Sequence, residues 1–302
     1  MKYSIFKLEF FSGVHFGRGI LNDSGETFSS DMLFSALYIE ALKMGVPEAL
    51  YQAALAGKLL FSDAFPYVGD QYMLPKPMLY IESAKKGDSE EKKKYKALKY
   101  FPAEDMEAYL AGKLNLDKNP MKEFGYFSQR TMAAVRRPED TLPFQVGEFY
   151  YKAGNGLYVI VAYEETSYLE LAESLLEAVS YTGIGGKKSE GLGRFVLKHG
   201  TKTDKVLQCF EKRTGRYMLL STALATDEEL ESALDGASYL LTKRSGFIAS
   251  DTYALEARRK MDLFVFASGS CFVNRFSGDI FDVSIGGGHP VYRYAKSLFV
   301  EV

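Results

Sequence analysis

One segment decides how this chain is interpreted: Gly183-Ile184-Gly185-Gly186-Lys187-Lys188-Ser189-Glu190-Gly191-Leu192-Gly193-Arg194-Phe195. It combines five glycines with two lysines and an arginine. Glycine permits positive φ and close approach of a partner, and successive free amides can form an anion-binding concavity. The residues before it, 168–181, predict a helix, and residues 194–198 predict a strand.

This order of elements excludes the common nucleotide-binding loops. A phosphate loop of the nucleotide-hydrolase or dinucleotide type follows a strand and opens a helix, whereas here the helix comes first. The spacing also differs, because Gly191 is followed by Leu192 rather than lysine. We therefore interpret the loop as a site for a phosphate backbone, where amides hold phosphates and Lys187, Lys188 and Arg194 neutralise their charge.

The flanking sequence predicts an α+β fold. Apolar patterns and caps predict strands over 1–11, 61–67, 144–151, 156–163 and 194–198, and helices over 30–44, 48–56 and 167–180. Residues 1–200 then form the split βαβ pattern of a ferredoxin-like (RRM-like) domain, with an insertion at about 69–150. Its lysine-rich run, 85–99, is typical of a solvated surface.

The second half of the chain partly repeats this pattern. Strands are predicted over 216–222, 238–250, 262–274 and 292–302, and a capping box at 226–229 predicts a helix to about Leu234. A second glycine cluster, 286–288, precedes the final strand. We predict tandem ferredoxin-like domains over 1–200 and 204–302, joined by a hinge at 200–203, with the second copy lacking its second helix.

Composition restricts the function. The chain has 302 residues and a net charge of −2, so it lacks the broad basic field of a protein that coats nucleic acid. Two cysteines are too few for a disulfide framework or a zinc site. The first eleven residues alternate like a half-buried strand rather than a signal peptide, and no apolar run is long enough for a membrane helix. These features predict a cytoplasmic protein that does not contact a membrane.

The chain resembles the repeat-associated RNA-binding (RAMP) proteins of CRISPR systems, in particular the type III-A Csm subunit at the 5′ end of the guide RNA. The glycine loop between a helix and a closing strand is diagnostic of the superfamily. The matching segments are 14–19, 28–37, 183–195, 243–247 and 290–294.

The resemblance implies a subunit that is not an enzyme, has no cofactor or metal, and binds the repeat-derived 5′ handle of the guide (crRNA). Implied partners are the large polymerase-like subunit and the repeated backbone subunit, and target RNA is met only indirectly. A thumb-like hairpin, Arg130 to Phe149 here, would wedge the guide.

The residues expected to bind RNA form four groups. They are His15, Phe16, Gly17, Arg18 and Ser30 near the first strand and helix; Arg130, Arg136 and Arg137 in the hairpin; Gly183, Gly185, Gly186, Lys187, Lys188, Gly191, Gly193 and Arg194 in the first glycine loop; and Lys243, Arg244, Gly286, Gly287, Gly288, His289 and Arg293 in the second half. The arginines could instead be solvated, the second glycine cluster could be a plain loop, and Lys243 and Arg244 could contact a protein partner.

His15 leaves further alternatives open. It could be a hydrogen-bonded loop residue, an RNA contact beside Phe16 and Arg18, or the general base of a metal-independent endoribonuclease that processes repeat RNA. A third function, metal-dependent target cleavage, would need a loop carboxylate such as Asp23 or Asp31. Asp31 also suits the first turn of a helix, where an acid interacts favourably with the dipole.

Overall fold

The central strand of the protein, β10 (Asn155–Tyr163), is buried along almost its whole length. The computed structural model describes the chain except for residues 82–88, 135–141, 201–204, 209–214 and 251. In the main sheet, β10 pairs with β1 (Lys2–Phe10), β4 (Leu59–Phe61) and β5 (Phe65–Val68), and every pairing is antiparallel. The full order is β11-β1-β10-β5-β6-β7, where β11 is Phe195–His199, β6 is Gln71–Pro75 and β7 is Tyr100–Pro102, and β4 also pairs with β10.

Alternate side chains of β10 enter two different cores, because successive residues of a strand point to opposite faces of the sheet. Leu157, Val159 and Val161 belong to the first core, and Tyr158 and Ile160 belong to the second. A strand buried on both faces has a continuous apolar sequence, which explains the strongly apolar character of this segment.

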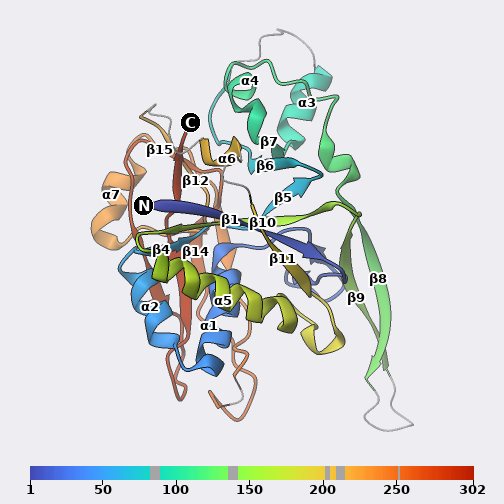
Figure 1. The fold of residues 1–302 in the computed structure, drawn as a ribbon, viewed down its shortest axis with the longest axis vertical. Coiled ribbons are helices and arrows are strands. Elements are labelled where there is room, and N and C mark those ends of the chain that lie inside the picture. The colour runs from blue at the N-terminus through green and yellow to red at the C-terminus, as the bar shows by residue number, and fades with distance from the viewer. Residues whose placement is uncertain (82–88, 135–141, 201–204, 209–214, 251) are drawn as a thin grey trace.

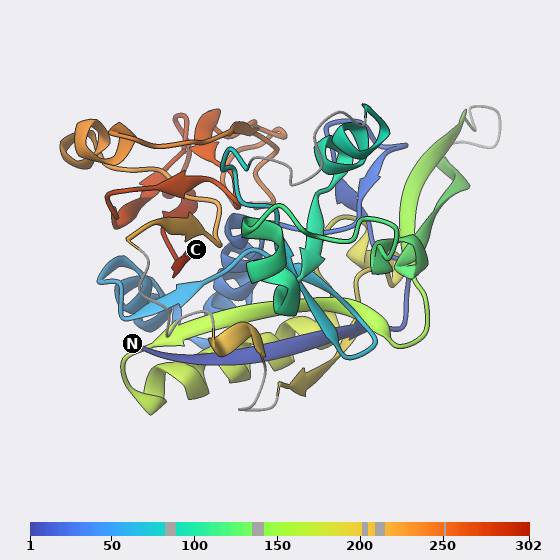
Figure 2. The same ribbon diagram turned by 90° about the horizontal axis from the view of Figure 1, so that it is seen from above.

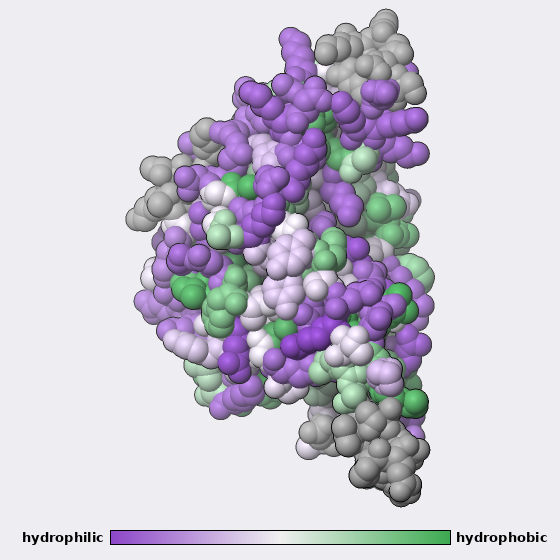
Figure 3. Space-filling model, turned by 90° about the vertical axis from the view of Figure 1, so that its right-hand side faces the viewer, coloured by the Kyte–Doolittle hydropathy of each residue, from purple (hydrophilic) through white to green (hydrophobic). Residues whose placement is uncertain are grey.

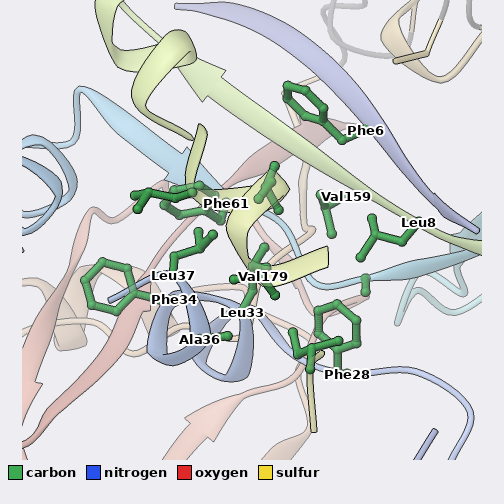
Figure 4. Close-up of a cluster of buried hydrophobic side chains, with 14 of the residues drawn as sticks. Phe6, Leu8, Phe28, Leu33, Phe34, Ala36, Leu37, Phe61, Val159 and Val179 are labelled. Atoms are coloured by element: carbon green, nitrogen blue, oxygen red, sulfur yellow. The ribbon is translucent and has the colours of Figure 1, made fainter. Parts of the chain in front are cut away.

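The first core lies between the sheet and three helices. These are α1 (Ser30–Met44), α2 (Pro47–Leu55) and α5 (Thr166–Thr182), which lie below the sheet in Figure 1. Leu33 and Leu37 of α1 and Val179 of α5 meet Val159 there (Figure 4). The structure confirms the predicted helices, including the end of α1 at Gly45, which is left-handed with φ 74°.

The inserted segment lies on the opposite face and at the end of the sheet (Figures 1 and 2). It contains β6 (Gln71–Pro75), α3 (Ser89–Ala97), β7 (Tyr100–Pro102), η1 (Ala103–Asp105), α4 (Met106–Leu110) and η2 (Pro120–Glu123). It then forms a long antiparallel hairpin, β8 (Gly125–Ala134) and β9 (Leu142–Tyr151), that projects from the body. The sequence pattern predicted only the second of these strands, at 144–151, and the resemblance implied a hairpin over Arg130 to Phe149.

The C-terminal half is built mainly from short strands. In chain order its elements are α6 (Lys205–Gln208), β12 (Tyr217–Leu219), α7 (Asp227–Leu234), β13 (Leu241–Arg244), β14 (Leu263–Phe266), β15 (Cys271–Phe272), β16 (Gly278–Asp282), β17 (Tyr292–Lys296) and β18 (Phe299–Glu301). The predicted capping box is present, with Thr226 and Glu229 bonded reciprocally. The strand predicted over 262–274 is interrupted, because Gly269 adopts φ 89° in a turn against the backbone of Lys76.

The two halves share both cores. Tyr294 packs on Phe34 and Phe61 in the first core, and its hydroxyl accepts a hydrogen bond from the Phe61 amide at 3.0 Å. Residues Met218 and Val300 lie with Tyr158 in the second core. The predicted hinge falls mostly on 201–204, outside the described residues, but the shared cores make the halves one packed body. No helix in the described part of the chain is long and apolar enough to span a membrane.

Two buried carboxylates connect α1 to the C-terminal half. Asp31 receives Nε and Nη2 of Arg244 at 3.0 and 2.9 Å, and it also pairs with Nη1 of Arg293. Burial would raise the pKa of Asp31, but the charges of Arg244 and Arg293 outweigh it and lower the pKa to about 2. Asp31 does lie in the first turn of α1, as predicted, but its ion pairs with Arg244 and Arg293 contribute more than its interaction with the helix dipole.

The second carboxylate, Asp63, replaces a local cap on α1. Ser29 occupies the N-cap position without making a side-chain cap bond, and the Ser30 amide instead donates to Asp63 at 2.7 Å. The amide and hydroxyl of Thr222 donate to the same carboxylate at 2.8 and 3.0 Å. Burial raises the pKa of Asp63, so its pH dependence is opposite in sign to that of Asp31.

We expect Asp31→Asn to lower the free energy of unfolding by about 3–5 kcal/mol at neutral pH, because it leaves Arg293 buried without its anion. The folded pKa of about 2 lies below the unfolded value, so the contribution is present above about pH 4 and is lost as the pH falls toward 2. Urea unfolding followed by tyrosine fluorescence measures this, since the chain has no tryptophan.

The matched control is Asp262→Asn, which removes the carboxylate of an exposed pair with Lys243. It should change the stability little. Equal free energies of unfolding for Asp31→Asn and the parent protein at pH 7 would contradict a structural role for the buried pair. A difference in unfolding free energy that stays the same at acid pH would contradict it as well.

Candidate nucleic-acid interface

The first glycine loop is held by close backbone packing. A Cβ atom on Gly193 would lie 2.1 Å from the Ile184 carbonyl oxygen, and one on Gly185 would lie 2.7 Å from that of His15. Both glycines have positive φ, 77° and 98°. These glycines are therefore required because two backbone segments touch, and a side chain could not fit between them.

Many amides of the loop are used inside the protein. The Ile184 amide donates to Gly193 at 3.0 Å, the Gly186 amide to His15 at 2.8 Å and the Gly193 amide to Gly13 at 2.9 Å. The first bond closes the base of the loop, and the other two fasten the loop to the segment that follows β1. The expectation of a loop with bared amides is corrected for these positions, and the outer turn η3 (Lys188–Glu190) is the part that extends from the anchored base.

His15 lies beneath this loop. Its Nδ1 donates to the Gly147 carbonyl of β9 at 2.7 Å, and the residue is only 6% exposed. A Cβ on Gly186 would lie 2.6 Å from the His15 ring, so the loop glycine covers the imidazole directly. Of the alternatives for His15, this geometry matches the hydrogen-bonded loop residue.

Lys187 connects the loop to the projecting hairpin. It adopts a left-handed conformation with φ 58°, and its Nζ lies 5.0 Å from the centre of the Phe144 ring on β9. Nζ also lies 3.2 Å from Glu190 Oε1. Arg130 on β8 reaches the same glutamate from the other side, with Nη2 3.7 Å from Oε2. The structure therefore brings together two predicted groups of basic residues.

The remaining basic side chains near the loop are accessible. Arg194 is exposed at the beginning of β11 (Phe195–His199), and Lys188 is partly exposed in the outer turn. Gly17 and Arg18 are exposed at the end of the short strand β2 (Phe16–Gly17), which pairs with β3 (Ser24–Gly25). These positions remain predictions for RNA contact.

Several predicted RNA-binding side chains have internal roles instead, which corrects the expectation for them. Phe16 is 2% exposed, and its ring packs edge-on against Phe10 and Phe28 in the first core. Ser30 is fully buried at the start of α1, and its hydroxyl bonds the backbone of Thr222. Arg293 is buried on Asp31, so its side chain is not open to an RNA strand.

The other residues of the second half that were predicted to bind RNA differ in how exposed they are. Arg244 is committed to Asp31, whereas Lys243 forms an exposed pair with Asp262 at 2.7 Å. Gly286, Gly287 and Gly288 form an exposed bend against Tyr253. His289 Nε2 lies 2.8 Å from the Ser250 hydroxyl. Arg136 and Arg137 lie outside the described residues.

Sequence reasoning overlooked the acidic members of this site. Glu190 lies within the basic loop, three residues after Lys187, and could have been noticed there. Glu148 could not, because its role depends on the hairpin register that sets it beside Arg130, Nε to Oε1 3.1 Å. Within the described residues, no cluster of three or more histidine, cysteine or acidic side chains could hold a metal ion.

Comparison with known proteins identifies the family. The family model of the CRISPR Csm4 C-terminal domain matches residues 212–302. The CRISPR system Cms protein Csm4 of Mycobacterium tuberculosis (strain ATCC 25618 / H37Rv) is 37% identical over 305 residues, covering 100% of this chain and 98% of that protein. The chain belongs to the Csm4 family. The Csm4 protein of Streptococcus thermophilus is 34% identical over 317 residues, covering 100% and 99%.

Solved structures share the fold of this Csm4-family chain. A chain in the crystal structure of a Csm3-Csm4 subcomplex of the type III-A CRISPR-Cas interference complex aligns with a TM-score of 0.65 at 17% identity, covering 100% of this chain and 99% of that one. A chain of the Csm1-Csm4 cassette in complex with cA4 aligns with a TM-score of 0.63 at 20% identity, covering 100% and 98%. The predicted resemblance to the Csm subunit is thereby confirmed, as is the mixed α and β fold with antiparallel sheets.

Because the loop is tightly packed at Gly193 and open at Gly191, we predict that alanine destabilises the protein more at Gly193 than at Gly191. Gly193→Ala and Gly191→Ala both place alanine at positive φ, which costs about 1–2 kcal/mol. Only Gly193→Ala also forces a methyl group onto the Ile184 backbone, so it should lose a further amount of about 1–3 kcal/mol. Urea unfolding of both variants measures the difference. Equal losses would mean that the loop yields at Gly193 and is not anchored there.

Proposed function

We propose that this chain is a crRNA-binding subunit of a type III-A CRISPR effector complex, that it binds the 5′ handle of the guide, and that it catalyses no reaction itself. The observation that carries the proposal is the anchored glycine loop, which presents Lys187 and Lys188 on a turn beside the hairpin. Basic side chains on such a turn suit the phosphates of an RNA strand. Membership of the Csm4 family supports the same role in antiviral defence.

We further propose that the fold is a tandem of ferredoxin-like domains. In the first half, β11-β1-β10-β4 gives the antiparallel order of a βαββαβ unit, with α1, α2 and α5 as the crossing helices. In the second half, β12 lies between β15 and β18, and α7 follows β12. The hairpin β16–β17 occupies the place in the chain where a second helix would come, which supports the predicted loss of that helix.

The β8–β9 hairpin is proposed to be the thumb that wedges the guide and reaches the adjacent backbone subunit. It projects from the body, and the face of the molecule that carries it mixes hydrophobic and hydrophilic residues (Figure 3). Tyr126, Phe127 and Leu142 are more than half exposed on it. Exposed aromatic side chains suit protein contacts or base stacking.

The proposed protein partners follow from the related structures. One related structure is a Csm3-Csm4 subcomplex and the other is a Csm1-Csm4 cassette. We propose that this chain likewise joins a repeated backbone subunit and a large polymerase-like subunit, and meets target RNA only indirectly. Its net charge of −2 suits a protein whose RNA contacts are local rather than spread over its surface.

The double substitution Lys187→Glu with Lys188→Glu tests the RNA-binding role. It should weaken binding to a labelled 5′-handle RNA, because two cations on one turn become anions. The slope of log affinity against log salt should fall by about 0.7 for each phosphate that the protein no longer neutralises. Fluorescence anisotropy of the full chain over a salt series gives both quantities.

The control reverses the same number of charges elsewhere. Lys113 and Lys118 are exposed in the inserted segment, and their change to glutamate should affect handle binding much less. Unchanged affinity of the Lys187/Lys188 variant at every salt concentration would reject the loop as the RNA site.

The alternative function, repeat-RNA processing with His15 as general base, predicts a different result. The buried ring of His15 and its bond to Gly147 support a structural role. We therefore expect purified protein to leave repeat RNA intact, with or without His15→Ala. Site-specific cleavage by the parent protein that disappears in His15→Ala would establish the enzyme instead.

A further inference from the structure

Four charged side chains meet where the glycine loop contacts the hairpin. Arg130 lies between Glu148, Nε to Oε1 at 3.1 Å, and Glu190, Nη2 to Oε2 at 3.7 Å. Lys187 lies 3.2 Å from the other oxygen of Glu190. Two cations thus face two carboxylates, and the cluster as a whole carries no formal charge. An RNA phosphate approaching Lys187 and Arg130 meets the carboxylate of Glu190 between them.

The two glutamates are held very differently. Glu148 is 2% exposed within the hairpin, and its second oxygen accepts a hydrogen bond from the Tyr150 hydroxyl at 2.6 Å. Glu190 is 25% exposed, and no hydrogen bond holds its Oε2 atom, which is buried in the same way as Oε1 of Glu148. Its carboxylate is held by the two cations, so Glu190 is the member of the cluster that another anion can replace.

The backbone around Glu190 permits that replacement. The short turn η3 lies between two left-handed residues, Lys187 with φ 58° and Gly191 with φ 87°. A Cβ on Gly191 would meet nothing within 4 Å, whereas Gly185 and Gly193 are wedged against backbone. The outer turn therefore borders open space at Gly191, whereas the base of the loop is anchored by close backbone contacts.

We propose that Glu190 occupies the position of an RNA phosphate, and that RNA binding exchanges its carboxylate for a phosphodiester oxygen held jointly by Lys187 and Arg130. The inference rests on the proposed role of the loop in binding guide RNA. Phosphate and carboxylate oxygens accept the same charge-assisted hydrogen bonds from arginine and lysine. The subsite takes one phosphodiester and spans the loop and β8.

This exchange changes what the loop selects. A phosphate must displace a carboxylate that is already paired, so an isolated anion gains little from the site. A strand that also contacts Lys188 and Arg194 supplies the additional interactions that displacement requires. Glu190 thus lowers the affinity of the site for isolated anions. It also makes RNA binding at the loop depend on Arg130 of the hairpin.

Glu190→Gln tests the exchange, because the amide keeps the shape of the side chain and removes its charge. Its affinity for a fluorescein-labelled single-stranded oligouridylate should rise about two- to five-fold at low salt, the range expected for a partly exposed ion pair. The gain should shrink as salt screens the competing charge. Fluorescence anisotropy of the full chain measures both effects, and Glu190→Ser should show the same gain if the first variant folds poorly.

Two controls separate exchange from a change in loop shape. Glu123→Gln removes another glutamate that is paired with a lysine, Lys152, at the base of the hairpin, and should leave the affinity unchanged. In a Lys187→Met background, the gain from Glu190→Gln should be smaller, because one of the two cations for which carboxylate and phosphate compete is gone and only Arg130 remains.

Equal or weaker binding by Glu190→Gln would overturn the exchange and show that the carboxylate positions the loop. If the parent protein binds oligouridylate and only this gain is missing, the exchange alone fails. If the parent protein binds neither oligouridylate nor handle RNA at low salt, the proposed function of the loop fails as well.

Discussion

The structure depends on a close contact between two stretches of backbone, the first glycine loop and the segment that follows β1. Hydrogen bonds from Gly186 to His15 and from Gly193 to Gly13 join them. Glycine is required at this contact because a Cβ on Gly185 would lie 2.7 Å from the carbonyl oxygen of His15. The contact fixes the base of the loop, and it thereby places Lys187 against the hairpin strand β9.

Two charge clusters in the protein differ in burial and therefore in use. Asp31 and Arg293 are almost fully enclosed, so their pair ties α1 to the C-terminal half and is strongly weakened only by acid or by substitution. Lys187 and Glu190 are each one quarter exposed, so water and other anions can compete for them. The buried pair of Asp31 and Arg293 thus stabilises the contact between the two halves, whereas the partly exposed pair of Lys187 and Glu190 can exchange its anion.

Elements whose signals lie in neighbouring residues were predicted from the sequence, and elements that depend on distant partners were not. Helix α1 with its end at Gly45, helix α5 and the capping box of α7 were all predicted from neighbouring residues. Strands β6, β7 and β16 were missed, because each is short and its pairing partner is not encoded in its own pattern. Helix α3 lies in a lysine-rich run that the sequence predicted to be a solvated surface.

The sequence alone determined the order of helix, glycine loop and strand, the basic character of that loop, and the family resemblance. The order and the basic character are properties of adjacent residues, and the resemblance rests on short segments that are each recognisable without their neighbours in space. Only the tertiary structure decided which predicted side chains are open to a ligand: it buried Phe16, Ser30 and Arg293 and paired Lys187 and Arg130 with Glu190. Burial and ion pairing arise where distant segments meet, so they depend on packing that no local pattern contains.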